Sequence, residues 1–114
     1  MAGAKIVVLY PQPKDVAAFE KAYLEEHMPL AAEKLLGTSK VVLSKTLSSP
    51  LGGSPQFHRI AEIHFPTLEA LQACLSSPGG QETAAHAVAI STGGAPVFMI
   101  AEEETSSFAQ RAKA

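Results

Sequence analysis

The residue best placed for proton chemistry in this 114-residue sequence is His27. It continues an apolar stripe with Phe19 and Tyr23, at spacings of four, on a helix that precedes Pro29. An unperturbed imidazole has a pKa of about 6.5, and a position near a helix C-terminus favours its charged form. His27 is therefore a candidate general acid or base. The alternative is structural: His27 hydrogen-bonds a backbone carbonyl that Pro29 leaves without a donor.

Two further pairs of residues are candidates for the same site. Tyr10 and Tyr23 each carry a hydroxyl that can hydrogen-bond a ligand from a pocket wall, although burial with one polar end explains them as well. Glu62 and His64 share one face of a predicted strand, because side chains alternate along a strand with period two. A dehydrated carboxylate needs a partner, so this pair is a secondary candidate. Its alternative role is a polar patch at a subunit contact.

Other chemistries find little support in the pattern of residues. No two histidines stand at a metal-ligand spacing such as i, i+4, and we predict no metal and no cofactor. The sequence has no Gly-x-Ser-x-Gly signature, and no Gly-rich phosphate loop follows a strand. Cys74 has no basic neighbour in sequence to make a thiolate, which is typical of a core residue. His86 lies on an alanine-rich helix and is interpreted as a surface residue.

The elements that position these residues follow from hydrophobic periodicity and breaker residues. The predicted strands span residues 5–10, 39–47, 57–65 and 96–101. Asp15 and Thr67 are N-cap candidates for two helices. The first helix is expected to stop or kink at Pro29, with a short helical piece over 30–36. The second helix restarts at a Ser-Pro pair and runs to residue 90.

The resulting order β-α-β-β-α-β predicts an α+β, ferredoxin-like fold, in which an antiparallel sheet carries the helices on one face. The uncovered face of such a sheet should alternate to polar residues. Instead both faces of the first strand are apolar, with Val7 and Leu9 opposite Ile6 and Val8. A monomer rarely exposes so large an apolar patch, so the second face is expected to pack on a second copy or to enclose a cavity. We predict a homodimer.

Length and charge bound the class of protein further. The chain suffices for one core over residues 1–105, followed by a polar C-terminal tail over 106–114. Nine basic and eleven acidic side chains give a net charge of −2, without the basic cluster that nucleic acid demands. No apolar run approaches the roughly 20 residues needed to cross a bilayer, and the start lacks the apolar region of a secretory signal. We therefore expect a cytoplasmic protein that binds neither nucleic acid nor membrane.

Three stretches of the sequence together resemble the EthD family. They are YPQPKDVAAFEKAYLEEHMPLAAEKLLG, RIAEIHFPTLEALQACLSSPG and the terminal PVFMIAEEE, and the resemblance spans residues 6–104. It implies a dimeric α+β barrel, in which two ferredoxin-like sheets meet and each subunit keeps a pocket between its sheet and its helices. In a related isomerase the histidine corresponding to His27 is implicated in the active site, with a cysteine where this sequence has Ile63.

Two hypotheses for function remain open. In the first, a pocket lined by the five candidates Tyr10, Tyr23, His27, Glu62 and His64 binds a small apolar or aromatic molecule of catabolic or polyketide type. His27 would then be the acid or base of a cofactor-independent isomerase, cyclase or monooxygenase, the reaction classes that the resemblance implies. In the second, the protein is a non-catalytic dimeric binding or accessory protein, and His27 is a structural residue at a helix end. An enclosed cavity beside His27 favours the first hypothesis, and a filled interior favours the second.

Overall fold

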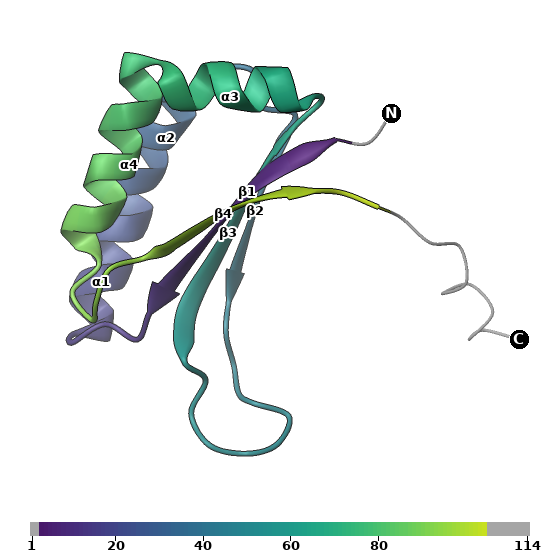
Figure 1. Cartoon of the computed structure of the whole chain (residues 1–114). Helices are drawn as coiled ribbons and strands as arrows, with labels where there is room; N and C mark the ends of the chain where they lie inside the picture. Colours follow the sequence, from purple (N-terminus) through teal and green to yellow (C-terminus); the bar gives the residue numbers. More distant parts are fainter. Residues whose placement is uncertain (1–2, 105–114) are drawn as a thin grey trace, which may run out of the picture.

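The computed structural model describes residues 3–104, which form a four-stranded antiparallel sheet with helices on one face (Figure 1). The strands are β1 (Ala4–Pro11), β2 (Lys40–Lys45), β3 (Phe57–Phe65) and β4 (Val97–Glu102). They lie in the order β2-β3-β1-β4, and every neighbouring pair is antiparallel. This order confirms the predicted ferredoxin-like α+β fold, with the first and third strands in the centre. The predicted polar tail, 106–114, lies outside the described residues.

The helices form a single layer on the sheet. They are α1 (Val16–Ala22), the π-helical turn η1 (Tyr23–His27), α2 (Met28–Lys34), α3 (Leu68–Ser76) and α4 (Pro78–Ile90). The predicted N-caps at Asp15 and Thr67 are confirmed, because each side chain accepts a hydrogen bond from the backbone N–H three residues later, at 3.0 and 3.1 Å. In Figure 1 α4 lies beside the long helix made of α1, η1 and α2. No helix among residues 3–104 is long and apolar enough to cross a membrane.

The first helix passes Pro29 without a break, which corrects the sequence-based expectation. Met28, directly before the proline, is helical, with φ −65° and ψ −42°. Within η1 the N–H of Met28 donates to the carbonyl of Tyr23, five residues earlier. This wider turn accommodates the proline ring, which in a regular α-helix clashes with the carbonyl four residues before it. Such turns recur at functional sites, and this one carries both Tyr23 and His27.

A close approach between helices explains the double glycine at the start of α4. A Cβ atom at Gly80 would overlap the carbonyl oxygen of Cys74, at the end of α3. A Cβ atom at Gly79 would lie 2.7 Å from the carbonyl oxygen of Lys34, in the last turn of α2. Glycine weakens a helix in isolation, but here it lets α4 pack tightly against both neighbouring helices. This packing holds α4 close over the sheet.

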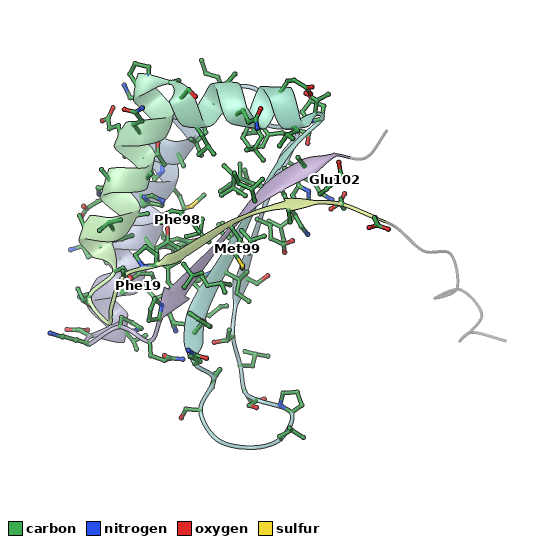
Figure 2. The ribbon with its side chains drawn as sticks, viewed as in Figure 1. Phe19, Phe98, Met99 and Glu102 are labelled. Carbon is green, nitrogen blue, oxygen red and sulfur yellow. The ribbon has the colours of Figure 1, made fainter. Side chains whose placement is uncertain are left out.

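The face of the sheet beneath the helices forms the core. Three pairs of side chains on β1 and β3 share this face: Ile6 with Ile63, Val8 with Ala61 and Tyr10 with Arg59. Phe19, labelled on α1 in Figure 2, and Leu71 of α3 close over them and are buried. The expected alternation of β3 is therefore confirmed from Arg59 onward.

The alternation of β3 fails at His58, which period two along the strand would place with Glu62 and His64 on the uncovered face. Tyr10 pairs with Arg59 whereas Pro11 pairs with Phe57, so the register shifts and His58 has no opposite residue. The bulged strand turns His58 toward α1, where its ring packs edge-on against Phe19. A one-residue irregularity of this kind reverses the face of a side chain.

Within residues 3–104 no helix covers the opposite face of the sheet, and much of that face is apolar (Figure 1). β4 is apolar on both sides: Phe98 lies on the helix side and Met99 on the uncovered side, and both are labelled in Figure 2. They are 43% and 44% exposed, respectively. Val7 and Leu9 of β1 adjoin the same uncovered surface, because they pair with Met99 and Val97. An apolar sheet face of this kind marks an interaction surface.

Candidate active site

A largely apolar cavity of about 220 Å³ lies between the sheet and the helices. Its walls come from all four strands, from η1 and α2, and from α4, where small side chains leave the space open. Its polar side chains are few, and they are Tyr10, Tyr23, His27, Thr38 and Thr83. An apolar cavity of about 150 Å³ accepts benzene. The space therefore fits a small molecule with a single substituted ring.

His27 is buried in the wall of this cavity, and each of its two ring nitrogens contacts one other side chain. Its Nε2 atom lies 3.4 Å from the hydroxyl of Tyr10, and its Nδ1 atom lies 2.9 Å from Nδ1 of His86. Neither contact is to a backbone carbonyl, the partner that the structural alternative required. The imidazole is instead held between β1 and α4.

The pKa of His27 is lowered to about 4, first by burial and second by the neighbouring His86. The expected effect of a helix C-terminus does not operate, because the helix continues through η1 into α2. Burial disfavours the charged form of an imidazole. His27 is therefore neutral at neutral pH, which suits a general base better than a general acid.

A stack of aromatic rings holds His27 in place. The rings of Phe19, Tyr23 and His27 lie nearly parallel along the helix, with successive centroids 5.5 and 5.9 Å apart. The ring of Tyr10 meets all three edge-on, at centroid distances from 5.4 to 6.4 Å. Edge-to-face and offset-stacked pairs are the favoured aromatic geometries. The rings of Tyr10 and Tyr23 therefore hold the imidazole of His27, the candidate base, in a fixed orientation.

The hydroxyl of Tyr23 has no hydrogen-bond partner in the described part of the chain. Tyr23 is 0% exposed, and among residues 3–104 its hydroxyl is the buried side-chain polar atom that remains unpartnered. Burial raises its pKa to about 12, and burial likewise raises the pKa of Tyr10. Both phenols are therefore protonated at neutral pH and can donate. An unpaired buried hydroxyl costs free energy, and Tyr23, which carries this one, is also a lining residue of the cavity.

A charged cluster of Glu20, His58 and Arg59 packs against the ring of Tyr23 and fixes its position. The guanidinium of Arg59 lies 5.1 Å from the ring centroid and forms two hydrogen bonds to Glu20, at 3.0 and 2.6 Å. His58 adds a third contact to Glu20 at 3.0 Å. The hydrogen bonds from Arg59, above all, lower the pKa of Glu20 to about 2. Arg59 is thus paired and stacked, which makes it a support for Tyr23.

Glu62 and His64 lie on the opposite face of the sheet and do not line the cavity. Glu62 accepts a hydrogen bond of 2.7 Å from Lys5, which lowers the pKa of the carboxyl. His64 lies 3.4 Å from a carboxylate oxygen of Glu103. The structure therefore brings together Tyr10, Tyr23 and His27 but separates this pair from them by the thickness of the sheet.

His86 is the site residue that the sequence analysis missed. From the sequence it was expected at the surface, yet its ring lies edge to edge with that of His27, with planes 6° apart and the two Nδ1 atoms 2.9 Å apart. A signal existed in the sequence: Gly80, Thr83 and Ala87 are small residues at spacings of three and four, and they mark the face of α4 that is buried. His86 flanks that face. The single cysteine, Cys74, is buried as expected, and residues 3–104 contain no group of three or more His, Cys, Asp or Glu side chains that could hold a metal ion.

Proteins of related structure share the arrangement of sheet and helices. An ethyl tert-butyl ether degradation (EthD) family protein from Bacillus halodurans superposes with a TM-score of 0.82 and 28% identity, over 91% of this chain and 100% of that one. A cofactor-independent oxygenase from Streptomyces nogalater, SnoaB, superposes with a TM-score of 0.64 and 14% identity, over 93% and 97% of the two chains. A dimeric ferredoxin-like protein of unknown function from Jannaschia superposes with a TM-score of 0.65 and 18% identity, over 90% of this chain and 100% of that one. The last two likenesses concern the fold alone.

Sequence comparison gives the family directly. An uncharacterized 11.0 kDa protein of the thcB-thcC intergenic region of Rhodococcus erythropolis is 26% identical over 99 residues, which are 87% of this chain and 94% of that protein. The EthD domain matches residues 11–90, which include η1, β3 and all of α4. The chain therefore belongs to the EthD family.

Proposed function

We propose that this protein is a homodimer that binds a small apolar or aromatic metabolite in the cavity beside His27, and that His27 acts there as a general base without a cofactor. The observation that carries the proposal is the buried hydroxyl of Tyr23, which has no partner among residues 3–104 and belongs to a residue that lines the largely apolar cavity. A few convergent polar groups in an apolar cavity are typical of a small-molecule site. A ligand oxygen would satisfy the Tyr23 hydroxyl at the place where His27 can reach a neighbouring proton.

The chemistry that suits this arrangement is removal of a proton from a carbon next to a carbonyl or from a phenol. The neutral imidazole of His27 takes the proton, and a tyrosine hydroxyl stabilises the oxyanion that develops. Return of the proton to another carbon gives an isomerisation, and attack of the carbanion within the molecule gives a cyclisation. Reaction of the carbanion with dioxygen gives an oxygenation in which the substrate supplies the electrons. The cofactor-independent oxygenase from Streptomyces nogalater, which has this fold, is an example of the last class.

The homodimer rests on the apolar, uncovered face of the sheet, and the dimeric relatives of this fold support it. Light scattering of the wild type is expected to give about twice the chain mass of 11.9 kDa. Met99→Lys places a charge on that face and is expected to yield monomers, because an unpaired buried charge is strongly unfavourable. Val88→Lys, at an exposed position of α4, is the control and should remain dimeric. A monomeric wild type would contradict this part of the proposal.

The second candidate function is non-catalytic binding, and one observation favours it. Both ring nitrogens of His27 already have partners within the chain, Tyr10 and His86. A histidine whose hydrogen bonds are satisfied can serve structure alone. The two functions differ in whether a bound ligand loses a proton to His27. The rate of proton exchange of the ligand distinguishes them, whereas the affinity for the ligand does not.

The variant Tyr23→Phe tests the cavity through its unused hydroxyl. Without ligand it is expected to be as stable as the wild type or more stable by about 1 kcal/mol, because it removes an unsatisfied buried group. With a ligand that stabilises the wild type, it should lose about 1 kcal/mol of binding, or about fivefold in affinity. The measurement is a thermal-shift screen of substituted aromatics, lactones and quinones, since a ligand that binds only the native state raises its melting temperature.

Tyr10→Phe is the matched control for that screen. The hydroxyl of Tyr10 already contacts His27, so its removal leaves a ring nitrogen without a partner and should lower the stability of the free protein. Equal effects of the two substitutions on the free protein would contradict the assignment of the Tyr23 hydroxyl as an unused donor.

A further inference from the structure

His27 and His86 form a hydrogen-bonded pair of imidazoles. Their rings are nearly parallel, with planes 6° apart and centroids 5.2 Å apart, and their Nδ1 atoms lie 2.9 Å from one another. Two neutral imidazole nitrogens at this distance share one hydrogen atom, so one ring donates and the other accepts. The pair is therefore a route along which a proton can pass from one ring to the other.

The neighbours of the pair decide which ring donates. The Nε2 atom of His86 lies 3.8 Å from a carboxylate oxygen of Glu26, and a carboxylate can only accept. This favours a hydrogen atom on Nε2 of His86, which leaves its Nδ1 as the acceptor. His27 then donates from Nδ1 and keeps a lone pair on Nε2, the atom that faces the hydroxyl of Tyr10 at 3.4 Å. The base atom of His27 thus lies on the cavity side.

Exposure to solvent rises in steps along the same line of residues. His27 is 6% exposed, the side chain of His86 is 26% exposed and that of Glu26 is 64% exposed. The line therefore begins in the cavity wall and ends in water. The titratable groups that face it are Tyr10 from β1, Tyr23 from η1, and Glu26 at its outer end.

We propose that His86 is the outer member of a two-imidazole proton relay that connects the cavity to solvent through His27. A proton taken by Nε2 of His27 is balanced by transfer of the Nδ1 proton of His27 to Nδ1 of His86. The Nε2 proton of His86 then leaves to water or to Glu26, and both rings end neutral in the opposite tautomer. The relay rests on the proposed function of His27 as a base, but the tautomers that prepare it belong to the free protein.

The tautomers are measured by nitrogen NMR of histidine-labelled wild-type protein without ligand, near pH 7.5, with the ring signals assigned through the contacts of each ring. We expect Nδ1 of His27 and Nε2 of His86 to be the protonated atoms. The reverse assignment, or free averaging of both tautomers in His27, would overturn the relay. A stoichiometric metal ion bound by the two rings in the purified protein would also overturn it. None of these outcomes depends on the identity of a ligand.

His86→Phe retains a flat ring that can occupy the same place beside His27 but removes both nitrogens. The Nδ1 signal of His27 is then expected to shift from the protonated to the unprotonated range, because its acceptor is gone. With a ligand whose proton exchanges in D2O, the variant should return more of the original hydrogen to the ligand, because the proton on His27 has lost its exit. A wild-type pattern in both measurements would overturn the role of His86. A ligand that exchanges no proton at all in the wild type would instead reject the proposed function and leave the tautomer result standing.

Discussion

His27→Gln is expected to slow the exchange of an acidic ligand proton with D2O by about 10²- to 10⁴-fold, the usual contribution of a positioned general base. Glutamine preserves the size and hydrogen-bonding capacity of the side chain but cannot take up a proton. The aromatic stack and the neighbouring Tyr10 otherwise remain. Proton NMR of a ligand found in the thermal-shift screen, incubated with enzyme in D2O, measures the rate directly.

His64→Gln is the matched control for this experiment. His64 is also a buried histidine, but it lies on the opposite face of the sheet, beside Glu103. Its replacement should leave the exchange rate unchanged while both variants bind the ligand and remain folded. An equal rate for wild type and His27→Gln would reject His27 as the base and favour the non-catalytic candidate function.

Acidification is expected to destabilise the protein through His27. Its pKa falls from 6.5 in the unfolded chain to about 4 in the native state, so between these values the unfolded chain binds a proton that the native state excludes. The free energy of unfolding is therefore greatest above about pH 6.5 and falls as the pH drops toward about 4, by roughly 3 kcal/mol for this group. Urea unfolding at a series of pH values measures the loss.

His27→Gln isolates that contribution, because the variant has no titrating group at the position. The difference between the two stability curves should appear between about pH 6.5 and about pH 4 and stay constant below it. Glu20 acts in a lower window, since its native pKa of about 2 removes stability only below its usual value of 4.5. Parallel curves for wild type and His27→Gln across the upper window would contradict the buried, neutral state of His27.

Most of the fold could be predicted from the sequence because its signals are local. Asp15 and Thr67 cap helices through hydrogen bonds to residues three positions away, and β3 begins and ends at the predicted residues, Phe57 and Phe65. The order of elements then leaves few topologies to consider. The course of the helix past Pro29 could not be predicted, because a single π-helical turn depends on how the chain packs and has no distinct periodicity.

The candidate site was predicted in part. Tyr10, Tyr23 and His27 meet because the apolar stripe of one helix faces the apolar side of one strand, a relation that periodicity reveals. His86 was missed because its neighbours on α4 are small, and alternating alanines give no clear hydrophobic stripe. Strict alternation along β3 would put His58 on the wrong face, because a bulge leaves no mark in composition. The positions of His58 and His86 thus depend on contacts between segments that are far apart in the sequence, and local patterns do not reveal such contacts.

A crystal structure of the protein with the most stabilising compound of the thermal-shift screen would show whether the cavity beside Tyr23 and His27 is a ligand site. We expect the compound to lie between the sheet and α4, with a polar atom within hydrogen-bonding distance of the Tyr23 hydroxyl. An empty cavity, with the compound bound on the uncovered face beside Met99 or elsewhere, would contradict it.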